Sequence, residues 1–207
     1  MKKVIFTTIY SIFIGLSCYA GTEPNEKPLN ISERNQKIYE VTKKNLASFL
    51  ENIPAGFESQ HGFSSRSEFA KAVAGPVYTI VGVDENCNTF STNLCNIPVL
   101  VNNEYRSMIT VSEKDGVYEI QTVGAALLAN ELQVLENFNA TNHDYIMLNV
   151  YSKSSGFVAY PELHTSIEVY NFIPLESAQT TLRTSESTVK PAYKLSELIE
   201  VLKISNH

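Results

Sequence analysis

The feature that most constrains the fold is a block of alternating apolar and polar residues between positions 76 and 123. Such alternation indicates strands with one face against a core. The strand segments are PVYTIVGV, IPVLV, EYRSMITV and VYEIQTV. Asn102 and Asn103, and then 114–116, favour tight turns, because asparagine and glycine tolerate positive φ. The block predicts a four-stranded antiparallel meander whose first, longer connection contains Cys87 and Cys95.

Two helical segments precede this block. The first has Ser32 as a candidate N-cap and ends before Pro54. Its apolar positions fall on one helical stripe, and they are Ile38, Val41, Leu46, Phe49, Leu50 and Ile53. Ser65 and Glu68 have the spacing of a capping box, so we expect a short second helix that ends before Pro76.

Further helices and strands are predicted after the meander. They are a helix over 125–138, a second hairpin over 145–160, a strand over 166–173 and a helix over 195–203. The stretch 176–191 is rich in serine and threonine without a period, and it is expected to be a surface loop. Runs of strands between helices favour an α+β fold. We expect a single α+β domain over 32–207, with an antiparallel sheet, meander plus second hairpin, packed by amphipathic helices.

The first twenty residues are expected to be an export signal. Two lysines precede the apolar run VIFTTIYSIFIGLS, which is too short to span a bilayer and is followed by small and then polar residues. Cleavage after Ala20 leaves a flexible leader over 21–31. Alternatively, a lipidated Cys18 becomes the mature N-terminus, since 15–18 resemble a lipobox with Leu16 displaced by one position. The predicted location is periplasmic or secreted, or alternatively that of a membrane-tethered lipoprotein.

The two remaining cysteines are expected to pair. Exported proteins fold in an oxidising compartment, where an even number of cysteines forms disulfides. Cleavage or lipidation removes Cys18 and leaves Cys87 and Cys95. We expect a disulfide between them that clips a strand connection. Their spacing is not that of a C-x-x-C redox or metal site.

The charge balance argues against nucleic acid as a partner. The chain has 16 basic and 22 acidic side chains, and loss of Lys2 and Lys3 with the signal leaves 14 against 22, a net charge of −8. A surface of this sign repels phosphate backbones and chiefly supports solubility. A membrane is expected as a partner only through the signal or through a lipid anchor on Cys18.

The sequence lacks the signatures of common enzymes, among them G-x-S-x-G, H-E-x-x-H, the Walker loop and G-x-G-x-x-G. Neither a catalytic residue nor a cofactor is therefore predicted. The candidate metal or polar site combines histidines and carboxylates of the second half, which are His143, Asp144, Glu162 and His164. In an extended segment, Glu162 and His164 share a face.

Aromatic residues are concentrated in the second half of the chain. Most are expected to pack in the core or on a sheet face. Tyrosine is also common on recognition surfaces, because it offers a large contact area at a low entropic cost. The candidate binding surface consists of Tyr145, Tyr151, Tyr160 and Tyr170.

The segment 97–132 resembles uncharacterised exported bacterial proteins. It has a polar hairpin, a strand ending in T-V, a D-G turn, and a strand ending in V-G before an Ala/Leu-rich helix. The order of a helix followed by an antiparallel meander is similar to cystatin-like and PepSY-type inhibitory or propeptide modules. Gln121, Thr122, Val123 and Gly124 lack the spacer of the cystatin-type Q-x-V-x-G loop, so inhibition by a wedge is only an analogy.

These features predict an exported, non-enzymatic protein-binding or inhibitory module of the bacterial envelope or secretome, with another protein as its partner. The alternative is an envelope enzyme or metal-binding protein that uses the histidines and carboxylates of the second half. A secreted factor acting on a host fits the same features as the first hypothesis, since both require only an export signal and a stable surface.

Overall fold

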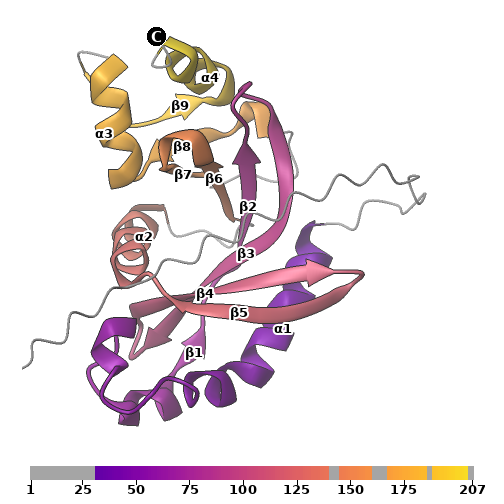
Figure 1. Cartoon of the computed structure of the whole chain (residues 1–207), viewed down its shortest axis with the longest axis vertical. Coiled ribbons are helices and arrows are strands. Elements are labelled where there is room, and N and C mark those ends of the chain that lie inside the picture. Colours follow the sequence, from indigo (N-terminus) through magenta and orange to yellow (C-terminus); the bar gives the residue numbers. More distant parts are fainter. Residues whose placement is uncertain (1–30, 140–144, 160–166, 186–187, 205–207) are drawn as a thin grey trace, which may run out of the picture.

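A computed structural model describes residues 31–139, 145–159, 167–185 and 188–204. These residues form one nine-stranded, mostly antiparallel sheet with helices on it, which confirms the predicted α+β class (Figure 1). The α-helices are α1 (Ile31–Leu50), α2 (Ala126–Asn139), α3 (Glu176–Ser185) and α4 (Leu195–Ile204). The strands are β1 (Val73–Ala74), β2 (Tyr78–Val83), β3 (Thr89–Val101), β4 (Glu104–Lys114), β5 (Val117–Gly124), β6 (Tyr145–Val150), β7 (Ser155–Ala159), β8 (Asn171–Pro174) and β9 (Tyr193–Lys194). The short 3-10 helices are η1 (Glu58–His61), η2 (Arg66–Lys71), η3 (Tyr151–Lys153) and η4 (Ile167–Val169).

The predicted meander is confirmed. Strands β2, β3, β4 and β5 lie side by side in this order, and each consecutive pair is antiparallel. Asn102 and Asn103 form the β3–β4 turn with φ of 53° and 66°, the left-handed conformation that asparagine tolerates. β3 is longer than expected because it begins at Thr89, so Cys95 lies within the strand and not in the connection before it.

A parallel pair joins the two halves of the sheet. β2 runs beside β6 in a register from Tyr78↔Tyr145 to Val83↔Val150, and β7, β8 and β9 follow as antiparallel neighbours. Parallel strands need a long crossover connection, and here it contains β3, β4, β5 and α2. As a result, α2 lies between the end of the molecule that carries α1 and the end that carries α3 and α4 (Figure 1).

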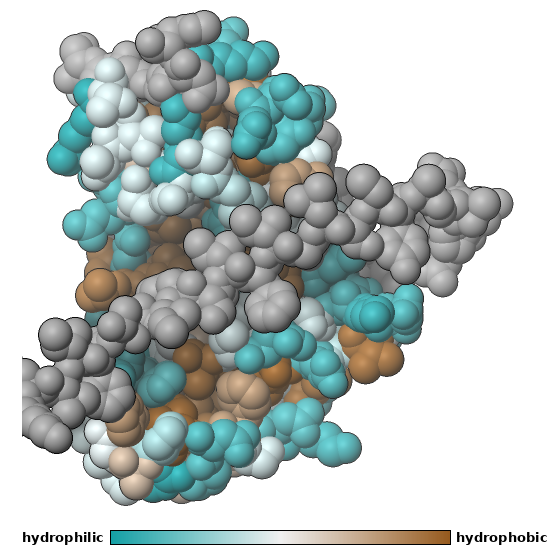
Figure 2. All heavy atoms as spheres, viewed as in Figure 1, coloured by the Kyte–Doolittle hydropathy of each residue, from teal (hydrophilic) through white to brown (hydrophobic). Residues whose placement is uncertain are grey.

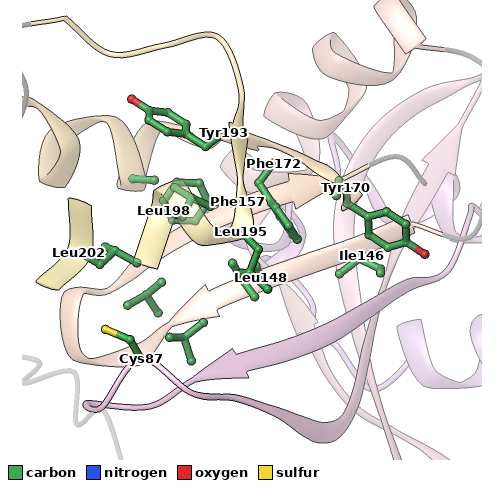
Figure 3. Close-up of a cluster of buried hydrophobic side chains, with 14 of the residues drawn as sticks. Cys87, Ile146, Leu148, Phe157, Tyr170, Phe172, Tyr193, Leu195, Leu198 and Leu202 are labelled. Atoms are coloured by element: carbon green, nitrogen blue, oxygen red, sulfur yellow. The ribbon is translucent and has the colours of Figure 1, made fainter. Parts of the chain in front are cut away.

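Alternate residues of the central strands enter cores on opposite faces of the sheet. Ile146 and Leu148 of β6 belong to a cluster that α4 closes (Figure 3). Met147 between them belongs to a cluster that α2 closes. A third cluster lies between α1 and the meander and includes Ile38 and Ile97. The sheet therefore carries helices on both faces, and α2 covers the face opposite α4.

Residues 176–185 form helix α3, where a Ser/Thr-rich loop was expected over 176–191. Ala178 and Leu182 stand four positions apart, and both are fully buried. Two apolar residues are too few to produce a helical stripe in the sequence. The expectation of a loop was wrong because tertiary packing of this narrow face, rather than helix propensity, stabilises the helix.

Two smaller expectations also differ from the structure. The expected short helix over 65–74 is the 3-10 helix η2, and the Ser65 side chain makes no cap. The Glu68 carboxylate accepts a hydrogen bond from the Ser64 N–H at 2.7 Å instead. The strand expected over 166–173 contains η4 and becomes a strand only at Asn171.

The predicted Cys87–Cys95 disulfide is not formed, and both residues are buried free thiols. Cys87 lies in the β2–β3 turn, beyond the pair Val83↔Thr89, whereas Cys95 pairs with Thr79. The strand from Thr79 to Val83 spans about 13 Å, and a disulfide needs Cα atoms within about 7 Å. Cys87 enters the cluster under α4 (Figure 3), and Cys95 enters the one under α1. The hairpin register therefore keeps the two thiols apart.

The expected export signal and Cys18 lie outside the described residues, as does the leader except for Ile31, the first residue of α1. Within the described part of the chain, no helix is long and apolar enough to cross a membrane. Export stays a prediction from the sequence.

Candidate functional site

Two neighbouring cavities lie along α2, and we call them together the α2 groove. The first cavity has a volume of about 610 Å³ and is bounded by the sheet, α2, the start of α3 and the turn η3. The second has a volume of about 740 Å³ and lies between α2, α3 and 189–191. Glu131 of α2 lines both cavities. Figure 2 shows apolar side chains gathered at the level of α2, between the two ends of the molecule.

The polar groups beneath the first cavity are paired within the protein. Asn96 on its floor accepts a hydrogen bond from the Thr110 hydroxyl at 3.0 Å. Ser155 is within 2.6 Å of the Thr181 hydroxyl, and the Ser177 hydroxyl accepts the N–H of Gly156 at 3.1 Å. These bonds shape the cavity and satisfy its buried polar atoms.

Helix α2 is held firmly in place. Its inner residues Ala129 and Leu132 are fully buried. Gln133 binds the β3–β4 hairpin: its side-chain oxygen accepts the Tyr105 N–H at 2.9 Å, and its amide donates to the Asn103 carbonyl at 3.0 Å. Such support from packing and hydrogen bonds fixes the geometry of the outer residues of the helix.

The chain turns abruptly from β5 into α2. Ala125 has a φ of 55°, a left-handed conformation that costs a residue with a Cβ about 1–2 kcal/mol. Its carbonyl accepts a hydrogen bond from the Ala129 N–H at 3.1 Å. Strain of this kind persists only where the surrounding structure imposes it, and here it sets where α2 lies over the sheet.

The outer face of α2 exposes apolar side chains beside the groove. Leu127 is 86% exposed and lines the first cavity, and Val134 is 56% exposed and lines the second. Residues 127, 131 and 134 stand at i, i+4 and i+7, so Leu127, Glu131 and Val134 form one stripe. Exposed apolar residues that adjoin a hollow are typical of binding surfaces.

Glu131 connects α2 to α3. Its carboxylate accepts the backbone N–H of Glu176, the first residue of α3, at 2.5 Å. Burial raises the pKa of Glu131; the hydrogen bond from the Glu176 N–H lowers it, and the negative charge of Glu176 raises it. Glu176 also lines the first cavity. Two carboxylates therefore border the same cavity.

An aromatic pair flanks the first cavity. Tyr151 lines the cavity and is 53% exposed. Its ring stacks on Phe90 with 6.2 Å between ring centroids and 28° between ring planes. A Cβ on Gly82 would come within 2.3 Å of the Phe90 ring. Because Gly82 has no side chain, the Phe90 ring can lie directly over its backbone and stack on Tyr151.

Of the described tyrosines expected to form a binding surface, Tyr151 is exposed and two are core residues. Tyr145 is 5% exposed and Tyr170 is 7% exposed. The Tyr145 ring stacks on Tyr78 with 4.7 Å between ring centroids. Tyr160 lies outside the described residues. The expectation was wrong for Tyr145 and Tyr170 because helices and neighbouring strands cover both faces of this part of the sheet.

The predicted metal or polar site of His143, Asp144, Glu162 and His164 lies outside the described residues. Among the residues that the structure describes, no group of three or more histidine, cysteine, aspartate or glutamate side chains is placed to hold a metal ion. His61 Nδ1 lies 3.1 Å from the Val123 carbonyl oxygen and connects the 3-10 helix η1 to β5. The metal-binding alternative stays a prediction.

The residues of the α2 stripe were not among those expected to form a site. Leu127 and Val134 did carry a signal, since both are apolar residues that stand outside the helical stripe of Leu128, Leu132 and Leu135. The contact between Glu131 and Glu176 had no such signal in the sequence, because the two residues are 45 positions apart and meet only through the fold.

Comparisons of the chain with family models, with curated proteins and with solved structures find no match. The geometry of the α2 groove is therefore what supports a function.

The burial of Glu131 predicts an unusual pH dependence for the Glu131→Gln variant. Folding raises the pKa of Glu131, so its stabilising contribution is present below the ordinary pKa of about 4.3 and is lost as pH rises through the folded-state pKa. Glutamine does not ionise, and its oxygen can still accept the Glu176 N–H. We expect the stability of the variant relative to wild type to rise as the pH increases above the ordinary pKa of a glutamate, as measured by urea unfolding.

Glu197→Gln is the matched control. The Glu197 carboxylate accepts the Lys194 N–H at 2.9 Å, and this hydrogen bond lowers the pKa of Glu197. Its contribution to stability is present above the ordinary pKa and is lost as pH falls, so Glu197→Gln should lose relative stability as pH rises. A parallel response of the two variants would contradict the assignment of Glu131.

Proposed function

We propose that this protein is an exported, non-enzymatic protein-binding or inhibitory module that takes a segment of a partner protein in the α2 groove. The observation that most directly supports this proposal is the exposure of Leu127 and Val134 beside the two cavities on either side of Glu131. Apolar side chains on a supported helix gain free energy when a partner covers them, at about 25 cal/mol per Å² buried.

The shape of the groove favours an elongated ligand. Leu127 and Val134 are seven residues apart, which is about 10 Å along a helix. An extended peptide covers the same distance with about three residues. A partner segment that crosses both cavities can therefore place one side chain in each and pass its backbone over Glu131.

Export and the lack of an enzymatic role rest on the sequence. The basic start, the short apolar run and the small residues before the polar stretch support a cleaved or lipidated export signal. The absence of the common hydrolase and nucleotide-binding signatures from the chain supports binding as the activity.

Site-specific photocrosslinking in the native envelope fraction tests this proposal. A benzophenone amino acid replaces Leu127 or Val134 in the groove, and Val117, which is 63% exposed at the β4–β5 turn, is the control position. We expect one defined protein adduct from positions 127 and 134 and none from 117. Excess wild-type protein should prevent the adduct, whereas excess Leu127→Asp protein should not.

Two outcomes would contradict the proposal. Adducts that form equally well from position 117 would show contact without use of the groove. No adduct from either groove position, with the protein present at its native level, would show that no partner occupies this surface.

A further inference from the structure

We propose that the segment bound in the α2 groove carries a lysine or arginine next to a large apolar residue, with the cation between Glu131 and Glu176. This inference rests on the proposed function and names the chemistry of the partner. It follows from three properties of the first cavity, which are its charge, its remaining hydrogen-bond acceptors and its apolar rim.

The charge of the first cavity has one sign. Glu131 and Glu176 line it, and none of the described lining residues is a lysine, arginine or histidine. The two carboxylates repel each other, and this repulsion is relieved when a cation binds between them. In contrast, Arg183 and Lys190 line the second cavity. A basic side chain is therefore expected in the first cavity and disfavoured in the second.

Acceptor capacity remains at the acidic pair. The Glu176 N–H reaches Glu131 through Oε1, and a carboxylate offers about four lone-pair sites on its two oxygens. The same hydrogen bond fixes the position of the Glu131 carboxylate before any ligand arrives. A partly buried, positioned carboxylate forms stronger bonds with a cation than a mobile surface carboxylate does.

The rim of the first cavity suits the rest of a basic side chain and its neighbour. Leu127 and Leu128 offer apolar surface for a methylene stem or an adjacent apolar residue. Tyr151 adds an aromatic ring at the same cavity, and a cation over such a ring gains further attraction. The cavity thus fits a cation on an apolar stem better than a neutral apolar side chain alone.

A displayed random peptide library, selected on the full mature protein, tests the inference. The Leu127→Asn protein is the counter-target, since it removes the apolar side chain without adding charge to the cavity; because Leu127 is 86% exposed, this variant should fold, and its unfolding curve must match wild type. Among peptides specific for wild type, we expect lysine or arginine within two positions of a large apolar residue at about three times its library frequency, since charge complementarity directs specificity.

The affinity of a selected peptide then measures how much the cation contributes to binding. Replacing its basic residue with norleucine should weaken binding about 10-fold, which is the effect of one charged hydrogen bond. In the Glu131→Gln/Glu176→Gln protein the same replacement should weaken binding by about 2-fold or less, since no carboxylate remains at the site. The Glu40→Gln protein, altered at an exposed position of α1 outside the groove, should keep the full 10-fold difference.

The outcomes separate the two proposals. If selected peptides bind wild type but not Leu127→Asn and show no excess of basic residues, the cation assignment is overturned and the groove function stands. A 10-fold norleucine effect that persists in the Glu131→Gln/Glu176→Gln protein also overturns the assignment. If no peptide distinguishes wild type from Leu127→Asn, both proposals fail.

Discussion

The Gly62→Ala variant is expected to lose about 4 kcal/mol of unfolding free energy, because a backbone conflict adds to a strained φ. Gly62 has a φ of 88°, and a Cβ there would lie 1.8 Å from the Arg106 carbonyl oxygen. That atom belongs to β4 and cannot move without moving the strand. The same Cβ would lie 2.9 Å from the Cβ of Ala126, the first residue of α2, so the substitution also disturbs the start of the groove helix.

The Gly56→Ala variant separates the effect of the close contact at residue 62 from the effect of the positive φ. Gly56 also has a φ of 88°, but a Cβ there would meet no atom within 4 Å. This control should lose only about 1 kcal/mol, the cost of a left-handed alanine. Urea unfolding of the two variants measures the difference. Equal losses would mean that conformation alone, and not the contact with β4 and α2, explains the glycine at 62.

The Arg34→Met variant is expected to lose about 3 kcal/mol, because it leaves a partly buried carboxylate without its ion-pair partner. Arg34 reaches from α1 to the sheet, and its Nε donates to the Glu113 carboxylate at 2.6 Å. The two side chains are 15% and 22% exposed. Arg34 Nη1 also lies 3.1 Å from Cys95 Sγ and 3.4 Å from the Thr79 hydroxyl. One side chain therefore connects α1 to three strands.

A double-mutant cycle with Glu113→Gln tests this account. Once Glu113 carries no charge, loss of Arg34 leaves no isolated carboxylate, so the double variant should be less destabilised than the sum of the single variants. The exposed pair Lys190–Glu197, 3.4 Å apart, is the control, and Lys190→Met should cost about 0.5 kcal/mol or less. Strict additivity at Arg34 and Glu113 would show that Arg34 acts through packing alone.

The same cluster explains why Cys95 is a core residue and not a reactive thiol. Burial raises the pKa of Cys95, and the positive charge of Arg34 opposes this rise without overcoming it. A neutral thiol is a poor nucleophile and a poor metal ligand. Cys95 therefore contributes packing and a contact with Arg34, in place of the disulfide expected from the count of cysteines.

Local patterns in the sequence were sufficient for the meander and for three of the α-helices. Alternation in 76–123 reflects strands that each have one covered face, and this depends on neighbours a few residues away. The turn at Asn102 and Asn103 follows from the residues that occupy it. α1, α2 and α4 each carry a broad apolar stripe that a helical period detects.

Features that depend on contacts between distant segments could not be predicted from the sequence. The α3 helix has only two buried anchors, Ala178 and Leu182, and it exists because the sheet is there to bury them. The distance between Cys87 and Cys95 follows from the register of a hairpin, and register is set by the whole sheet. Which tyrosines reach solvent depended on the helices that cover each face.

The candidate site shows most clearly the difference between what local sequence patterns predict and what long-range contacts decide. The amphipathic period of 125–138 indicated a helix, and Leu127 and Val134 stand outside its apolar stripe, which includes Leu128 and Leu132. Their role as the rim of a groove, and the meeting of Glu131 with Glu176, came from the parallel pairing of β2 with β6, which brings the two halves of the chain together around α2. Sequence periodicity reports the burial of each element against its local surroundings, whereas a site between elements depends on long-range packing, which leaves no periodic signal in the chain.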